Sequence, residues 1–174
     1  DVQTQAFHKT ANEKTTLLRI SAGFEKEELS DPTVIYFAPK AEVSFDKELD
    51  ALKLMNTNPE VPSIYSLTSD KKELSINALP IALQKDQVRI PMGYNALKAG
   101  KLQIELQDIE NLPPGFQIYL VDLERKQYID LQQEKAYTTH IPKGSSNNRF
   151  ELILSKEAIS DPSKLLNISM NVLA

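Results

Sequence analysis

Apolar and polar residues alternate with a period of two over much of the chain, which is the pattern of strands with one buried face. The clearest example is the segment 101–109, in which Leu102, Ile104 and Leu106 alternate with glutamine and glutamate residues. Segments of this kind, and short β-branched or aromatic runs bounded by turn residues, predict further strands. They cover residues 15–24, 32–39, 62–69, 73–80, 86–94, 117–123, 127–131, 136–141 and 149–155. The segment 164–173 is an additional candidate strand.

Turn residues between these segments predict how neighbouring strands are joined. Asp-Lys-Lys after the strand at 62–69 predicts a hairpin with 73–80, and Glu-Arg-Lys predicts a second hairpin within 117–131. The prolines and glycine of 110–115 predict a break, and the polar run 142–148 predicts a loop.

One segment is predicted to be helical. Phe45, Leu49 and Leu52 stand at i, i+4 and i+7 within 45–55, which places them on one side of a short amphipathic helix. The same letters also fit an irregular strand, and 25–29 is predicted to be a turn. With many short strands and at most one short helix, we expect an all-β fold, specifically an antiparallel β-sandwich of the jelly-roll type.

The sequence predicts a single domain over residues 1–174, because no repeat, low-complexity run or linker divides it. This length is sufficient to bury a sizeable core. The chain starts without methionine and stops within an apolar segment, so we expect it to be a piece of a longer protein.

The composition narrows the possible functions. Hydrophobic residues make up 41% and charged residues 25%, which is ordinary for a globular protein. A formal net charge of −4 implies no basic surface for nucleic acid, and no apolar window reaches the roughly 18 residues of a transmembrane helix. The absence of cysteine excludes disulfides, thiolate catalysis and cysteine metal sites.

Residues that commonly act in catalysis are scattered along the sequence. His8 and His140 are isolated, whereas a zinc site needs three or four clustered ligands, and no G-x-S-x-G motif is present. Asp122, Glu124 and Asp130 flank a hairpin turn. A hairpin surface has no walls, so these carboxyl groups would stay hydrated and make poor general acids. We therefore expect no enzymatic activity, no catalytic residues and no cofactor.

A calcium site is the metal site that the carboxylates suggest. Glu42, Asp46 and Asp50 recur every four residues, and carboxylates that share one helix face can hold Ca²⁺. However, the sequence has no D-x-D-x-D-G loop, and Lys47 and Lys53 are close enough to act as partners. A solvated, ion-paired face is the preferred interpretation, with these three carboxylates as the candidate metal ligands.

Tyrosines are the candidate binding residues. Tyr119, Tyr128 and Tyr137 lie in predicted strands, where exposed rings could stack on the faces of sugar rings. Half-buried tyrosine within a sheet is the simpler expectation, and the absence of tryptophan lowers the support for sugar binding. A carbohydrate-binding module is therefore the alternative function.

Five segments within residues 44–154 together form a recognisable pattern. They are FDKELDALKL, PSIYSLTSDKKELSINALP, VRIPMGY, IYLVDLERKQYIDLQQEKAYTTHI and NRFELIL. In this order and spacing they resemble a β-rich module of secreted Bacteroidetes proteins that commonly precedes a C-terminal type IX secretion sorting domain. The matching positions, here called the motif residues, are Asp46, Asp50, Lys53, Ser75, Ile76, Asn77, Leu79, Pro80, Pro91, Gly93, Asp122, Asp130, Leu131, Tyr137, Arg149 and Phe150.

The resemblance implies a non-catalytic module with a structural or adhesive role. It also implies an extracellular or cell-surface location in a Gram-negative bacterium. The implied partners are the remainder of the parent chain and, beyond it, a surface glycan or another cell-surface protein. No catalytic residue accompanies the resemblance. We hypothesise that Asp122 and Asp130 cap backbone N–H groups or pair with Arg125 or Arg149.

Overall fold

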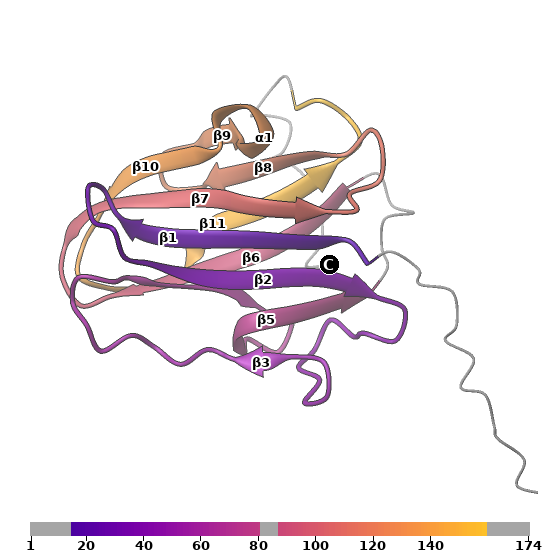
Figure 1. The fold of residues 1–174 in the computed structure, drawn as a ribbon, viewed down its shortest axis with the longest axis horizontal. Coiled ribbons are helices and arrows are strands. Elements are labelled where there is room, and N and C mark those ends of the chain that lie inside the picture. The colour runs from indigo at the N-terminus through magenta and orange to yellow at the C-terminus, as the bar shows by residue number, and fades with distance from the viewer. Residues whose placement is uncertain (1–14, 81–86, 160–174) are drawn as a thin grey trace, which may run out of the picture.

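The strands form one mixed β-sheet that curls until its two ends approach each other (Figure 1). The computed structural model describes residues 15–80 and 87–159, so the candidate strand 164–173 and His8 lie outside the described residues. The elements are β1 (Leu17–Phe24), β2 (Ser30–Ala38), β3 (Ala51–Leu52), β4 (Ser63–Leu67), β5 (Glu73–Pro80), β6 (Gln87–Ala96), β7 (Gly100–Glu110), β8 (Gln117–Asp122), β9 (Gln127–Asp130), α1 (Leu131–Glu134), β10 (Ala136–Ile141) and β11 (Gly144–Ser155).

The order of strands across the sheet is β10-β7-β1-β2-β5-β4-β6-β11-β8-β9, with β3 added beside β5. The two predicted hairpins, β4–β5 and β8–β9, are confirmed. The all-β prediction is also confirmed. The antiparallel arrangement holds for every described pairing except β2–β5, which is parallel. The result is a nearly closed, barrel-like sheet.

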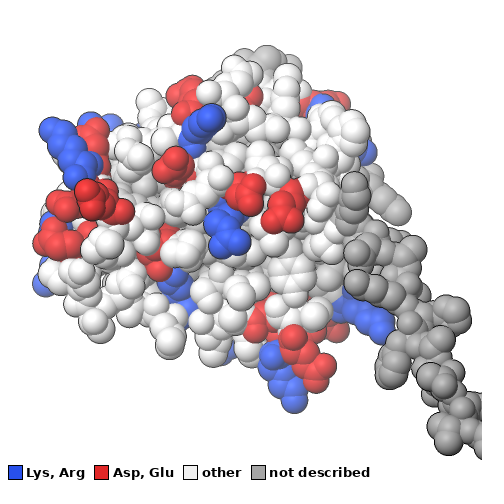
Figure 2. Space-filling model, viewed as in Figure 1, with Lys and Arg blue, Asp and Glu red and all other residues white. Residues whose placement is uncertain are grey.

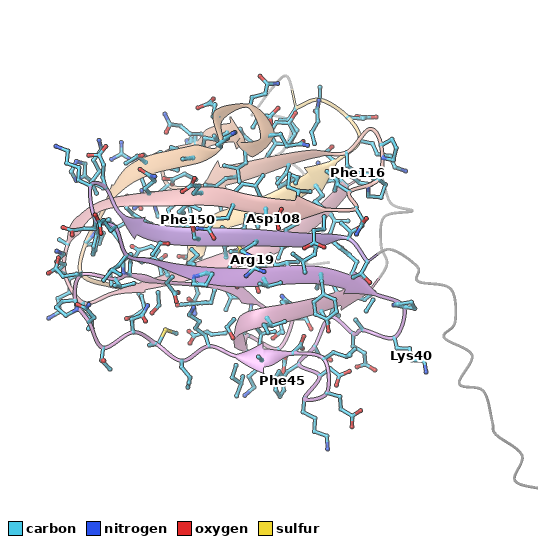
Figure 3. The ribbon with its side chains drawn as sticks, in the orientation of Figure 1. Arg19, Lys40, Phe45, Asp108, Phe116 and Phe150 are labelled. Carbon is cyan, nitrogen blue, oxygen red and sulfur yellow. The ribbon has the colours of Figure 1, made fainter. Side chains whose placement is uncertain are left out.

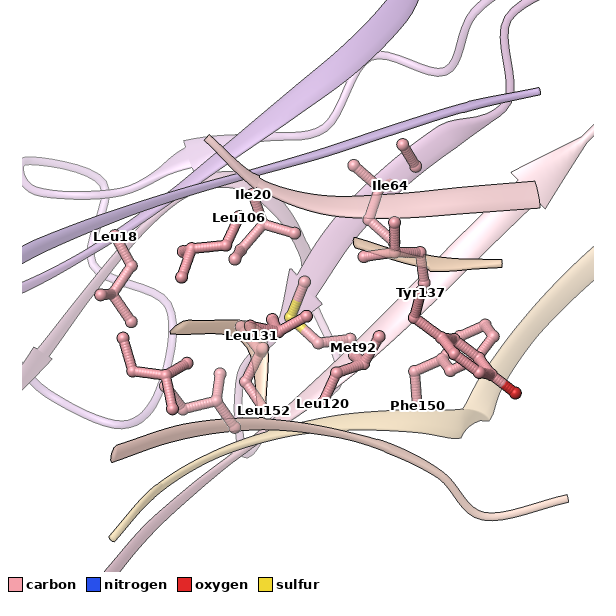
Figure 4. Packing of buried hydrophobic residues seen from close by; sticks show 14 of the residues in the cluster. Leu18, Ile20, Ile64, Met92, Leu106, Leu120, Leu131, Tyr137, Phe150 and Leu152 are labelled. Atoms are coloured by element: carbon pink, nitrogen blue, oxygen red, sulfur yellow. The ribbon is translucent and has the colours of Figure 1, made fainter. Parts of the chain in front are cut away.

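Alternation places one apolar face of the strands inside the curled sheet. Leu18, Ile20 and Leu106 come from β1 and β7, and they face Leu120 and Leu152 from β8 and β11 within one buried cluster (Figure 4). Burying a side chain of this size contributes about 1.5–3 kcal/mol relative to leaving it exposed. The period-two pattern of 101–109 is thus explained, because its leucines and isoleucine line this core.

β5 pairs with β4 over its first residues and with β2 from Ile76 onward, so the sheet divides between these two pairings. Charged side chains lie at this division. Asp31 Oδ2 accepts the backbone N–H of Ile64 on β4 at 2.8 Å. The same oxygen forms an ion pair with Lys53, whose side chain is only 4% exposed. Asp31 thus replaces the backbone partner that Ile64 lacks at this point, and Lys53 compensates the buried charge.

The predicted helix over 45–55 is wrong. Residues 46–50 form a turn instead, and the short strand β3 follows, as the alternative of an irregular strand suggested. The turn is fixed by Asp50, which accepts the backbone N–H of Asp46 at 2.8 Å and that of Ala78 on β5 at 2.7 Å. One carboxylate thus accepts hydrogen bonds from backbone N–H groups of both the turn and β5. These bonds favour the turn over a helix here.

Two further local predictions are wrong. The polar run 142–148 was expected to be a loop, but β11 begins at Gly144, which pairs with Ala96 on β6 before a bulge interrupts the register. The strand expected over 127–131 stops at Asp130, and a single helical turn, α1, follows.

Candidate functional site

A buried network of charged and polar groups joins β8 to β11. Asp122 is fully buried and Arg149 is 4% exposed. Arg149 Nη2 donates to Asp122 Oδ2 at 2.9 Å, and Arg149 Nε lies 3.2 and 3.3 Å from the two carboxylate oxygens. Asp122 Oδ1 also accepts the backbone N–H groups of Glu124 and Arg125, both at 3.1 Å. One carboxylate therefore holds both the guanidinium and the hairpin turn.

The same network reaches β10, at the opposite end of the sheet. The Tyr137 hydroxyl lies 3.1 Å from Asp122 Oδ2 and 2.8 Å from Gln127 Oε1. Arg149 Nη2 donates to Thr139 Oγ1 at 2.8 Å. Because β10 pairs with β7 and not with β8 or β9, these side chains connect the two ends of the sheet. We call Asp122, Tyr137, Thr139 and Arg149 the closing network.

The electrostatics of the closing network favour a structural role. Burial raises the pKa of the Tyr137 hydroxyl, and the neighbouring Asp122 charge raises it further, so the phenol stays protonated at neutral pH. Burial acts to lower the pKa of Arg149, but the hydrogen bond and charge of Asp122 outweigh it and raise the pKa overall. Neither group is held near its titration point, which a general acid or base requires.

The hypothesis that Asp122 and Asp130 cap backbone N–H groups or pair with an arginine is confirmed, with both roles for Asp122 and the capping role for Asp130. Asp122 pairs with Arg149 rather than with the Arg125 side chain, and it caps the turn after β8. Asp130 is the N-cap of α1, where its Oδ1 accepts the backbone N–H groups of Gln132 and Gln133 at 3.0 and 3.3 Å.

Replacing Asp130 with Ala is expected to lower the free energy of unfolding by about 1 kcal/mol, because α1 loses its N-cap while the bonds concerned are exposed. Chemical denaturation measures the change. Asp130→Asn is the matched control, since asparagine caps a helix about as well as aspartate. An equal loss for both variants would show that the charge, rather than the cap, matters.

The three candidate tyrosines do not share one surface. Tyr137 belongs to the closing network. Tyr119 is 7% exposed, and it packs on the outer side of the sheet with Val121 and Ile153. Its hydroxyl accepts the backbone N–H of Ile159 at 3.2 Å. Tyr128 packs beside this outer cluster and is partly exposed. A row of exposed rings for sugar stacking is therefore not formed by these residues.

The candidate calcium ligands accept hydrogen bonds from other groups of the protein. Asp46 and Asp50 bind backbone N–H groups in their own turn, and Glu42 Oε2 lies 3.3 Å from the Ser44 hydroxyl. Across residues 15–80 and 87–159, no group of three or more His, Asp and Glu side chains is suited to hold a metal ion. The expected helical face of carboxylates is wrong because the segment is a turn.

A cleft of about 440 Å³ lies between β7 and α1, a site that the sequence did not suggest. Its lining residues are Glu105, Leu106, Gln107, Asp108, Ile109, Leu131, Gln132 and Lys135. The cleft is a product of unequal strand lengths: β10 begins at Ala136, opposite Glu105, whereas β7 continues to Glu110. Alternation within 101–109 identifies the buried face of β7 but carries no information on where its neighbour stops.

The visible surface carries charges of both signs. Figure 2 shows basic and acidic side chains interspersed among uncharged ones, without a broad area of one sign on this face. His140 is exposed on β10. Within the part of the chain that the structure describes, no helix has the length and apolar character needed to cross a membrane.

Comparison with known proteins gives one match. The family model described as "Domain of unknown function (DUF8693)" matches residues 1–154. The chain belongs to this family. No curated protein and no solved structure matches the chain significantly. The family match ends one residue before the end of β11, so it includes every described strand almost completely.

Proposed function

We propose that this member of the DUF8693 family is a non-catalytic structural module of a secreted or surface-attached bacterial protein. It acts as a spacer, a stabilising unit or part of an adhesin. The two halves of its curled sheet serve as the two layers of a sandwich-like support. Its partners are the remainder of the parent chain and other molecules at the cell surface.

The main support for this proposal is that the polar motif residues form hydrogen bonds and ion pairs inside the fold. Asp50 and Lys53 bind groups of the sheet's divided region, and Asp122, Tyr137 and Arg149 form the closing network. A pattern that marks a catalytic family is expected to leave reactive side chains converging in a pocket. Here the pattern's polar members are occupied by internal hydrogen bonds and ion pairs.

The location follows from the resemblance to secreted modules that precede a sorting domain. Protease treatment of intact cells that express the parent protein tests this part of the proposal. We expect loss of an epitope placed in this domain without loss of a cytoplasmic marker. Protection of the epitope in intact cells, with cleavage after lysis, would refute the surface location.

A glycan array tests the structural role against sugar binding. We expect the purified chain to bind no sugar class above background. Binding to one class that Tyr128→Ala abolishes, while Tyr119→Phe retains it, would replace the structural proposal with a carbohydrate-binding function. Tyr128 is chosen because it is the partly exposed member of the three tyrosines.

A further inference from the structure

A polar groove of about 250 Å³ lies on the outer side of β1 and β7, beside the turn that joins β1 to β2. Ser21 on β1 is opposite Glu105 on β7, and both line this outer groove together with Gln103. The residues that flank each of them along the strands belong to the buried core. Because side chains alternate between the two faces of a strand, these three point away from the core and into the groove.

The Ser21 hydroxyl is buried at the groove without a hydrogen-bond partner. Ser21 is 2% exposed. Within residues 15–80 and 87–159 the structure gives its hydroxyl no hydrogen bond. Buried polar groups are normally hydrogen-bonded, since an unpaired one destabilises the fold. A ligand that donates to this oxygen from within the groove would supply the missing partner.

Glu105 is a half-buried carboxylate that also lacks a partner. Its neighbours on the adjoining strands are Ser21 and Ala136, and neither carries a charge. Arg19, which is also on β1, lies opposite Asp108 instead (Figure 3). In the part of the chain that the structure describes, the Glu105 side chain forms no ion pair or hydrogen bond. A cation bound in the groove would therefore compensate a charge that the fold leaves unpaired.

The turn after β1 adds two more carboxylates to the groove. Glu27 and Glu28 are exposed and line it, and the one basic side chain that lines it is that of Lys26. With Glu105, three carboxylates accompany one ammonium group, so the groove favours a cationic ligand. No group of three acidic or histidine side chains among the described residues is placed to hold a metal ion. The favoured ligand is therefore an elongated cation whose charges lie apart.

The size of the groove limits this ligand further. Pockets for drug-sized molecules measure about 300–1,000 Å³, whereas the outer groove measures about 250 Å³. A flexible aliphatic chain with an amine at each end is slender, is doubly charged at neutral pH and presents N–H donors at both ends.

We propose that the outer groove binds a linear aliphatic diamine or polyamine. One ammonium group donates hydrogen bonds to Ser21 Oγ and to the Glu105 carboxylate, with Gln103 beside them. A second ammonium group lies against Glu27 and Glu28. The site does not rest on the proposed structural role, because a spacer supports its parent chain whether or not it binds an amine.

Titration with cadaverine tests the proposal. The diamine is added to the isotope-labelled chain at neutral pH and low salt, and backbone amide shifts are followed by NMR. We expect saturable shifts at Ser21, Gln103, Glu105 and the turn 25–28. Pentylamine has the same carbon chain with one ammonium group, so it is expected to bind about threefold more weakly, as the loss of one exposed ion pair implies. Pentanediol, which is uncharged, is expected not to saturate.

Two substitutions test the assigned contacts. Glu105→Gln keeps the shape of the side chain and removes its charge, so the affinity for cadaverine is expected to fall by at least about fivefold. Glu110→Gln is the matched control, since it removes one charge from the same strand outside the groove and is expected to change the affinity by less than about twofold. Ser21→Ala is expected to weaken binding without lowering the melting temperature, because the hydroxyl has no hydrogen bond to lose within the fold.

Four outcomes would overturn the proposal. Equal weakening by Glu105→Gln and Glu110→Gln would reduce binding to overall charge, and equal affinities for pentylamine and cadaverine would exclude a ligand held at both ends. Saturable shifts of the same amides with calcium, which cadaverine fails to displace, would assign the groove to a metal ion. The absence of saturable shifts with cadaverine would refute the site, while the structural role, tested on cells and by glycan array, would stand.

Discussion

Replacing Arg149 with Met is expected to lower the free energy of unfolding by about 3–5 kcal/mol. Met fills part of the space of the guanidinium but leaves Asp122 as a buried carboxylate without its ion-pair partner. The bond from Arg149 to Thr139 is also lost, so the connection between β11 and β10 weakens. Denaturant titration with two spectroscopic probes measures the change.

A rescue and a control distinguish this mechanism from loss of packing. Combining Asp122→Asn with Arg149→Met removes the unpaired charge, so the double variant is expected to be more stable than Arg149→Met alone. Arg125→Met, at an exposed position in the same hairpin, is expected to change stability by less than about 0.5 kcal/mol. Similar stability of the Arg149 and Arg125 variants would contradict a stabilising closing network.

Replacing Gly93 with Ala is expected to destabilise the fold by about 3 kcal/mol, at the upper end of typical overpacking costs. An added Cβ would lie 2.2 Å from Tyr65 Cε2 and 2.5 Å from Asn147 Oδ1. The Tyr65 ring is fully buried, and its hydroxyl is held by Asn147 Oδ1 at 2.7 Å, so the ring has little freedom to move. Thermal and chemical unfolding of the variant check the value.

A double-mutant cycle identifies the clash as the cause. In the Tyr65→Leu background the ring is absent, so Gly93→Ala is expected to cost much less than in the natural chain. A coupling energy of about 1–3 kcal/mol between the two positions would be typical of residues in contact. Additive effects would instead point to a backbone requirement at Gly93, which its extended strand conformation does not suggest.

Sequence patterns predicted the local structure well where one face of a strand is buried. The alternation in β7 reports burial directly as far as Leu106, and the turn chemistry located both hairpins. In β5 the alternation fails, because Ile76 is 40% exposed while Asn77 is 1% exposed. The helix over 45–55 failed because its apolar spacing arises by chance in a turn whose bonds come from Asp50. For α1 a signal was present, since Asp130 followed by Gln133 has the spacing of a capping box.

Long-range features could not be predicted in the same way. The parallel pairing of β2 with β5 and the hydrogen bond from Ile64 N–H to Asp31 both join segments that are distant in the sequence, and no local pattern predicts them. Arg149 could be named as a partner of Asp122, but its contact with Thr139 on β10 required the curled sheet. The cleft beside β7 likewise depends on where a distant strand, β10, begins.

The position of β11 has a consequence for how the molecule is made. It is the last strand among the described residues, yet it lies between β6 and β8 and pairs with both. A nascent chain therefore cannot complete the sheet while residues 144–155 are still inside the ribosome, and the facing edges of β6 and β8 stay open until then. Contacts between such distant segments also slow folding. The described sheet thus remains unfinished until residues 144–155 have emerged.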